Sequence, residues 1–157
     1  MSIEKVRDYF NKYGMADRMM EFEVSSATVA LAAQALGCEP DRIAKTLSFK
    51  VGEGCILIVT AGGAKIDNTK YKAQFHTKAK MLTPDEAVEL IGHAVGGVCP
   101  FGVNGGVVTY LDESLKAYQT VFPACGSDNS AIELTIDELE RYSNSKGWVD
   151  VCKTLAE

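Results

Sequence analysis

Two apolar, strand-like runs on either side of a glycine turn constrain the fold of this chain most strongly. Residues 43–50 and 55–60 are rich in apolar and β-branched residues, and Gly52-Glu53-Gly54 lies between them. Two such runs joined by a short glycine-containing turn are typical of a β-hairpin. We therefore expect residues 43–60 to form two adjacent antiparallel strands.

Lys45 interrupts the apolar face of the first of these strands. Side chains alternate between the two faces of a strand, so residues 43, 45, 47 and 49 share one face, and the other three are Ile, Leu and Phe. An ammonium group taken out of water needs a partner, a shifted pKa or a functional role. Two interpretations stay open: Lys45 extends its head to solvent from the strand end, or it serves a site.

Capping residues and periodicity predict five helices. Their expected positions are residues 3–13, 25–36, 68–75, 84–92 and a last long helix after Thr135. Ser25-Ser26 is the expected cap of the second helix, which stops at Gly37. Asp67 or Asn68 is expected to cap the third, and capping boxes begin at Thr83 and Thr135.

The remaining segments predict loops and further strands. Residues 93–106 are glycine-rich and are expected to be loop, while 107–111, 119–122 and 130–134 are strand candidates. Trp148 to Val151 is expected to return to the core. Mixed helices and strands with short links favour an α+β fold, with a mixed, largely antiparallel sheet flanked by helices. A length of 157 residues indicates a single domain over residues 1–157.

The composition indicates what kind of protein this is and which kinds of site we expect it to lack. Hydrophobic residues make up 46% and charged residues 24%, which is ordinary for a soluble globular protein. No signal-peptide core or membrane-length apolar stretch is visible, so we expect a cytoplasmic protein. Five cysteines without a CxxC pair are expected to be reduced thiols. His76 and His93 lack metal-ligand spacing, so we expect no metal site. No cofactor is expected either.

The charge distribution is uneven although the net charge is −5. Residues 65–80 carry five lysines against one acid, Asp67, whereas residues 133–140 carry four acids and no base. A local basic stretch can contact a phosphate backbone. The alternative is a solvated lysine-rich surface.

Two loops contain residue types suited to a polar ligand. Residues 96–102, Gly-Gly-Val-Cys-Pro-Phe-Gly, offer free backbone N–H groups for an anion or a developing oxyanion. Residues 124–130 concentrate small side chains with hydroxyl and amide groups. The structural alternatives are a tight crossover and an ordinary polar turn. No GxSxG motif is present, and Cys99 has no base beside it in the sequence, so a loop-lining role is expected for Cys99.

Taken together, these segments resemble the YbaK/ProX family of aminoacyl-tRNA deacylases and prolyl-tRNA synthetase editing domains. Ser26-Ala27-Thr28, with Ala32-Ala33 and Leu36-Gly37, is similar to the family's early helix, and residues 43–49 with their Lys-Thr-Leu core to its lysine strand. "IVTAGGAKIDNTK" (58–70), the 96–102 loop and "GSDNSAIEL" (126–134) follow in the family's order.

The resemblance implies cleavage of the ester joining a wrong amino acid to the 3′ adenosine of tRNA, without a metal or a protein nucleophile. It implies a catalytic role for Lys45 and backbone donors in the glycine-rich loop. The substrate-binding residues expected on this basis are Thr28, Gly96, Gly97, Val98, Cys99, Pro100, Phe101, Gly102, Gly126, Ser127 and Asn129. The expected tRNA contacts are Lys65, Lys70 and Lys72.

The resemblance also suggests partners and leaves alternatives open. The expected partner is an aminoacyl-tRNA acceptor end, such as tRNA(Pro) carrying alanine or cysteine, together with an aminoacyl-tRNA synthetase; no membrane or DNA partner is expected. Gly63 stands where many relatives have Asp, and Cys99 where Ser or Pro is usual. A non-catalytic tRNA- or synthetase-binding module and an amino-acid-sensing regulator are the alternatives.

Overall fold

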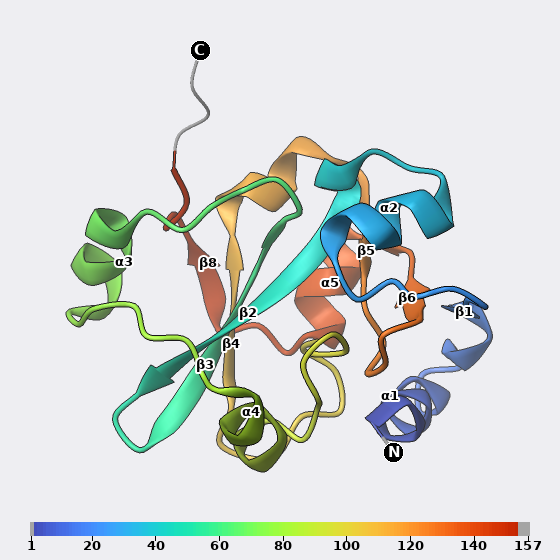
Figure 1. Cartoon of the computed structure of the whole chain (residues 1–157), viewed down its shortest axis with the longest axis horizontal. Helices are drawn as coiled ribbons and strands as arrows, with labels where there is room; N and C mark the ends of the chain where they lie inside the picture. The colour runs from blue at the N-terminus through green and yellow to red at the C-terminus, as the bar shows by residue number, and fades with distance from the viewer. Residues whose placement is uncertain (1, 154–157) are drawn as a thin grey trace.

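A computed structural model describes residues 2–153 (Figure 1). Its helices are α1 (Ser2–Asn11), α2 (Val29–Leu36), α3 (Asn68–Phe75), α4 (Pro84–Leu90) and α5 (Ile136–Tyr142), with short 3₁₀ turns at Ala16–Arg18, Pro40–Arg42 and Glu113–Ala117. Its strands are β1 (Met19–Glu21), β2 (Ile43–Val51), β3 (Gly54–Ala61), β4 (Val108–Asp112), β5 (Thr120–Pro123), β6 (Ser130–Ile132), β7 (Leu134–Thr135) and β8 (Gly147–Val149).

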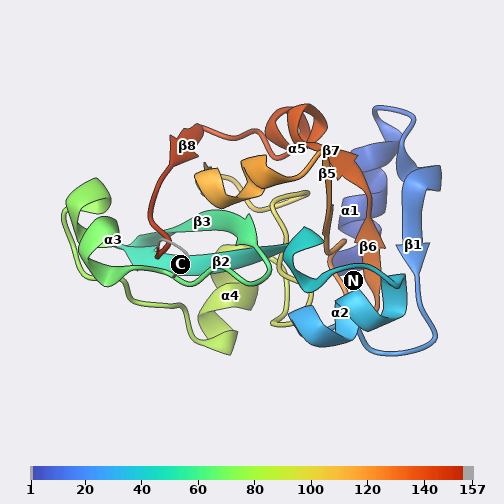
Figure 2. The same cartoon turned by 90° about the horizontal axis from the view of Figure 1, so that it is seen from above.

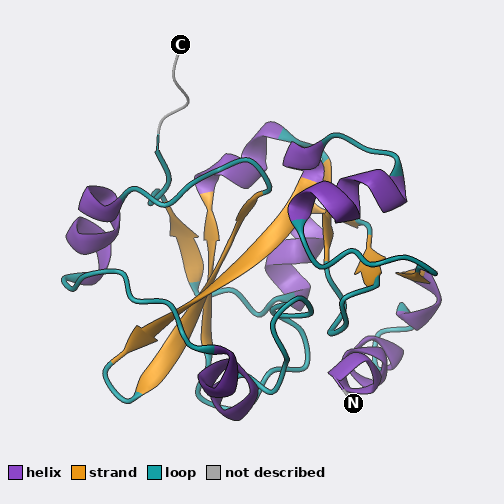
Figure 3. Ribbon diagram, viewed as in Figure 1, coloured by secondary structure: helices purple, strands orange, loops and turns teal. Residues whose placement is uncertain are grey.

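The expected hairpin forms the centre of a six-stranded mixed sheet in the order β7-β5-β2-β3-β4-β8. β2 and β3 pair antiparallel from Ala44↔Ala61 to Val51↔Gly54, which is the longest ladder of the sheet. β5 joins β2 in parallel, and β4 and β8 extend the other side in parallel. Figure 3 shows β2 as the long strand that crosses the molecule. The predicted α+β fold with a mixed sheet is confirmed.

A small second sheet was not predicted. β1 pairs antiparallel with β6, so that Met19 lies opposite Ile132. A three-residue strand has too few positions to display an alternating pattern, and its pairing depends on a partner more than 100 residues away. Figure 2 shows this sheet and α1 at one end of the molecule and α3 at the other.

Local caps determine where the helices begin. Thr83 and Thr135 form the predicted capping boxes, and Asp67 caps α3. The cap of α2 is Thr28, whose hydroxyl accepts from the Leu31 N–H, so the prediction of Ser25-Ser26 as the cap was wrong. Gly37 ends α2 as predicted, with a left-handed backbone (φ 69°).

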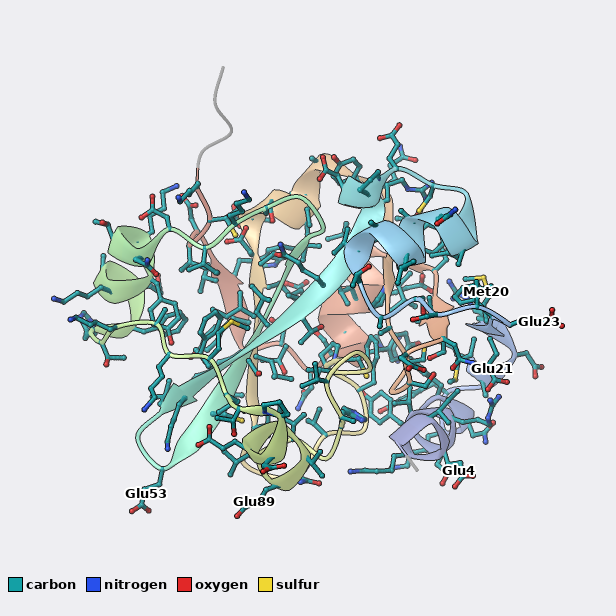
Figure 4. The ribbon with its side chains drawn as sticks, in the orientation of Figure 1. Glu4, Met20, Glu21, Glu23, Glu53 and Glu89 are labelled. Atoms are coloured by element: carbon teal, nitrogen blue, oxygen red, sulfur yellow. The ribbon has the colours of Figure 1, made fainter. Side chains whose placement is uncertain are left out.

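The core lies on both faces of the central hairpin. One cluster joins Val59 and Ala44 to α1 and α5 through residues such as Phe10 and Leu139, and another packs Phe49 and Ile58 against α3. Val149 and Val151 are buried, as expected for a closing segment that returns to the core. Acidic side chains such as Glu4, Glu53 and Glu89 point outward at the rim (Figure 4). Within the described residues, no helix combines the length and apolarity that crossing a membrane requires.

Candidate functional site

A small cavity lies where β5 separates from β2. The parallel ladder between these strands ends at Ala44↔Pro123, and the chain after Pro123 turns away. The resulting space measures about 130 Å³. Its wall residues come from the 26–32 segment, β2, the 96–98 loop and the strands β5 and β6. They are Ser26, Ala27, Thr28, Val29, Ala32, Ile43, Ala44, Lys45, Thr46, Gly96, Val98, Phe122, Ala124, Ser130 and Ala131.

Lys45 lies in the wall of this cavity and is half-buried. Its Nζ donates a hydrogen bond to the carbonyl oxygen of Ala64, in the turn after β3. Burial lowers the pKa of the Lys45 ammonium, and the nearby Lys65 charge lowers it further. The side chain therefore has a partner and a shifted pKa, and its head does not simply extend into solvent. An ammonium has three donors, so two remain after the bond to Ala64.

Three loops close the cavity on the side opposite β2. A Cβ atom built on Gly97 would lie 2.6 Å from both the Gly126 carbonyl carbon and the Ser127 nitrogen, so glycine is required for this approach. The Ser26 N–H donates to the Asp128 carbonyl at 2.6 Å. These contacts bring the predicted glycine-rich loop and the predicted polar loop together.

The late polar loop is held by its own side chains. The Ser127 hydroxyl lies 2.9 Å from Asn129 Oδ1 and 2.6 Å from the Ser130 hydroxyl, and the Asn129 amide donates to the Phe22 carbonyl. Of these, Ser130 lines the cavity, whereas Gly126, Ser127 and Asn129 do not. Ser127 and Asn129 therefore support the wall from behind.

The glycine-rich loop divides between cavity and core. Gly96 and Val98 line the cavity beside Thr28, whereas the side chains of Cys99 and Phe101 are fully buried in the core. Phe101 packs against Phe10 of α1 at 4.8 Å between ring centroids. Pro100 and Gly102 line a separate hollow beside α1. These last four residues fix the loop and do not line the cavity.

Cys99 and His93 meet in the core, a proximity that the sequence did not indicate. The Cys99 sulfur lies 3.6 Å from His93 Nε2, which is 2.7 Å from the Phe101 carbonyl oxygen. Because a carbonyl only accepts, Nε2 carries the proton and cannot take one from the thiol. Burial raises the pKa of Cys99 to about 12 and lowers that of His93. Both side chains are fully buried, so this pair does not form an accessible nucleophile and base.

The three predicted tRNA-contacting lysines differ in their surroundings. Lys65 and Lys72 are exposed. The Lys70 ammonium instead donates to the Cys152 carbonyl at 2.9 Å and lies 3.2 Å from Asp150. Lys70 therefore helps to hold the C-terminal segment.

Sequence reasoning did not identify two hydroxyl residues of the cavity wall as site residues. The side-chain oxygens of Ser26 and Thr46 are buried and have no hydrogen-bond partner in the described part of the chain. Thr46 follows Lys45 directly, and Ser26 was interpreted as a helix cap. An unpartnered buried hydroxyl becomes visible only when the neighbouring segments are in place.

Metal ligands do not gather near this cavity. In residues 2–153, no group of three or more His, Cys, Asp or Glu side chains is arranged to hold a metal ion. The acidic Asp41 contacts the backbone of Gly63, where a Cβ atom would meet its carboxylate oxygen. The polar groups available for chemistry at the cavity are therefore Lys45, hydroxyls and main-chain amides.

The comparison with known families agrees with this architecture. Residues 23–142 match the model of the aminoacyl-tRNA editing domain, and this range contains every residue of the cavity wall. The chain belongs to the aminoacyl-tRNA editing domain family. This membership confirms the family that the motifs indicated.

Relatives of this editing domain occur alone and within larger enzymes. The uncharacterized protein YwhH of Bacillus subtilis is 56% identical over 155 residues, which cover 98% of each chain. A proline–tRNA ligase of Thermosipho melanesiensis is 28% identical over 156 residues, and the match covers 96% of this chain but 27% of the ligase. A solved structure described as "a putative trans-editing enzyme for prolyl tRNA synthetase" superposes with a TM-score of 0.87 at 30% identity, covering 98% of both chains.

Proposed function

We propose that this editing domain hydrolyses the ester of mischarged aminoacyl-tRNA, and that its substrate is tRNA(Pro) carrying alanine, cysteine or a similarly small amino acid. The observation that carries the proposal is Lys45, a half-buried residue that lines a small cavity and donates from its ammonium to the Ala64 carbonyl. The family and the neighbour described as a trans-editing enzyme support the reaction class. The ligase relatives support the choice of tRNA(Pro).

The size of the cavity supports a small amino acid. A volume of about 130 Å³ is similar to the ~150 Å³ of an engineered protein cavity that binds benzene, so the space suits a small group. Ala32, Ile43 and Phe122 provide an apolar wall. Since a missing or additional methylene in such a pocket changes selectivity by about 10–200-fold, size alone favours small side chains.

The proposed chemistry is addition of water to the ester carbonyl, followed by departure of the ribose hydroxyl. Addition places negative charge on the carbonyl oxygen, and collapse releases a free amino acid and tRNA with an intact 3′ end. Lys45 can direct a free N–H toward this oxyanion while it keeps its bond to Ala64. Its lowered pKa fits an ammonium held in surroundings of low polarity, where its field acts strongly.

A panel of charged tRNAs tests the proposed reaction. Purified protein is mixed with tRNA(Pro) carrying alanine, cysteine, serine or proline, and loss of the ester is followed against buffer alone. Selective loss of a small non-cognate amino acid is the expected result. Survival of every ester, with tight binding of uncharged tRNA, would instead favour a binding module.

Replacing Lys45 tests the residue that carries the proposal. Lys45→Ala is expected to lower the deacylation rate by about 10²–10³, the cost of one oxyanion donor. Lys50→Ala is a matched control, because Lys50 is on the same strand but pairs with Glu86 at 3.1 Å, away from the cavity. An unchanged rate in a folded Lys45→Ala protein would remove Lys45 from the mechanism.

A further inference from the structure

The hairpin register determines which main-chain groups of β2 face the cavity. Val51 pairs with Gly54 across a two-residue turn, and such a flanking pair exchanges both main-chain hydrogen bonds. Hydrogen-bonded and non-hydrogen-bonded pairs then alternate along the ladder. Thr46↔Val59 lies five steps on and is a non-hydrogen-bonded pair, so the N–H and C=O of Thr46 point away from β3.

Main-chain partners are present on both sides of Thr46 along this edge of β2. Ala44 pairs with Pro123 of β5. Further along, the Ser48 carbonyl accepts from the Leu82 N–H at 3.3 Å, and the Lys50 N–H donates to the Lys80 carbonyl at 2.7 Å. Between these contacts, nothing in residues 2–153 forms a hydrogen bond with the outward N–H or C=O of Thr46.

The missing contact lies at the candidate site. Thr46 lines the cavity, and Ala124, where the next step of the β5 ladder would fall, lines it too. The Thr46 hydroxyl is also buried without a partner. Main-chain N–H and C=O groups of a folded protein are nearly always paired with protein, water or ligand. The sheet edge therefore has one vacant position, which faces a cavity of small-molecule size.

An amino acid esterified to ribose carries the groups that this position lacks. Its α-ammonium is a hydrogen-bond donor and its ester carbonyl is an acceptor. Both groups are attached to one Cα atom, as the N–H and C=O of a single residue are. In an antiparallel ladder, a hydrogen-bonded pair exchanges both bonds in this way.

We propose that the aminoacyl group binds to the main chain of Thr46 and pairs with it as one residue of a neighbouring strand would. The α-ammonium donates to the Thr46 carbonyl, and the ester carbonyl accepts from the Thr46 N–H. This inference rests on the proposed function and names how that site recognises its substrate. The Thr46 N–H stays hydrogen-bonded to the ester carbonyl oxygen when this oxygen becomes an oxyanion. Thr46 directly follows Lys45 in the sequence.

The first test changes the substrate and leaves the protein intact. Alanyl-tRNA and propanoyl-tRNA, which lacks the ammonium group, are compared by kcat/KM, each divided by its rate in buffer. The propanoyl ester is expected to be at least about tenfold poorer, the effect of one hydrogen bond from a charged group. Equal normalised values would overturn the proposed role of the ammonium.

The second test removes the Thr46 N–H. Thr46 is replaced by its α-hydroxy analogue, 2,3-dihydroxybutanoic acid, which turns the preceding amide into an ester and keeps the side chain. Turnover of alanyl-tRNA is expected to fall at least about tenfold, because the donor to the ester carbonyl is lost. The same replacement at exposed Thr77 is the matched control. Equal turnover by the wild-type protein and the Thr46 analogue would contradict main-chain recognition.

A binding measurement separates this inference from the proposed function. The probes are two stable amides, 3′-alanylamino-3′-deoxyadenosine and its propanoylamino counterpart. If no ester is hydrolysed but the alanyl amide binds at least tenfold more tightly, the hydrolase proposal fails and docking on Thr46 stands. If esters are hydrolysed and the two amides bind equally, the docking proposal fails alone.

Discussion

At the residue scale, Lys45 combines a charge with limited access to water. Its ammonium is bonded to a turn carbonyl and lies in the same wall as apolar side chains. Burial favours the neutral amine, so the charged form that the proposed reaction needs is held at a cost in stability. This arrangement is typical of a functional group that is positioned before the substrate arrives.

The lowered pKa of Lys45 predicts opposite trends for activity and stability as pH rises toward 10.5, the ordinary lysine value. The buffer-corrected deacylation rate should fall, because the ammonium is lost. The free energy of unfolding contributed by Lys45 should rise, since the unfolded chain then binds more protons than the folded one. Wild-type and Lys45→Met proteins are compared by urea denaturation between pH 7 and 10. A constant stability difference across this range would contradict the shift.

The sequence exposed the chemistry of some residues but not their surroundings. Lys45 could be identified because it breaks an apolar alternation, which is a local pattern. The vacant position at Thr46 could not, since it depends on where β5 leaves β2 and where residues 80–82 rejoin it. The burial of Cys99 beside His93 likewise depends on how α1 covers the loop.

At the scale of elements, the site depends on close contact between loops. The 96–98 loop and the 126–128 loop approach so closely that only glycine fits at position 97. Helix starts were predictable because a cap acts within one turn, as at Thr83 and Thr135. The contact between the two loops was not predictable, because the sequence of neither loop indicates which segment it packs against.

Gly97→Ala tests this contact between loops. The added methyl group would overlap the main chain of Gly126 and Ser127, so a loss of about 1–3 kcal/mol in unfolding free energy is expected, together with reduced deacylation. Gly105→Ala is the control, because a Cβ atom there meets nothing within 4 Å, and its effect should stay below about 0.5 kcal/mol. Urea denaturation of both variants provides the measurement, and similar midpoints would show that the loops can separate without cost.

At the scale of the whole molecule, one end carries a concentration of exposed lysines. The net charge is −5, yet exposed lysines gather on and around α3, at one end of the molecule (Figure 2). A tRNA acceptor end that approaches from this end would meet Lys65 and Lys72. The prediction of a local phosphate contact therefore remains compatible with an acidic protein.

Lys72→Ala tests whether this end contacts the tRNA backbone. Loss of one phosphate contact should weaken tRNA binding to a similar degree for every amino acid attached, and should reduce the slope of log affinity against log salt by about 1. Lys12→Ala, near α1 at the other end, should leave that slope unchanged. Affinity is measured at several salt concentrations, and equal slopes for the two variants would place the tRNA elsewhere.

The position of the C-terminal segment has a consequence for how the chain folds during synthesis. Cys152 forms an isolated antiparallel β-bridge with Ile66. The Asp67 N–H donates to the Val151 carbonyl, and the carboxylate of buried Asp112 accepts from the Val151 N–H. The turn that holds Lys45 is therefore anchored by residues that lie more than 80 positions further along the chain. Contacts between such distant parts of a chain slow folding. A nascent chain that does not yet include residues 151–152 therefore lacks the contacts that fix this lysine, and the site is completed only after that segment has been synthesised.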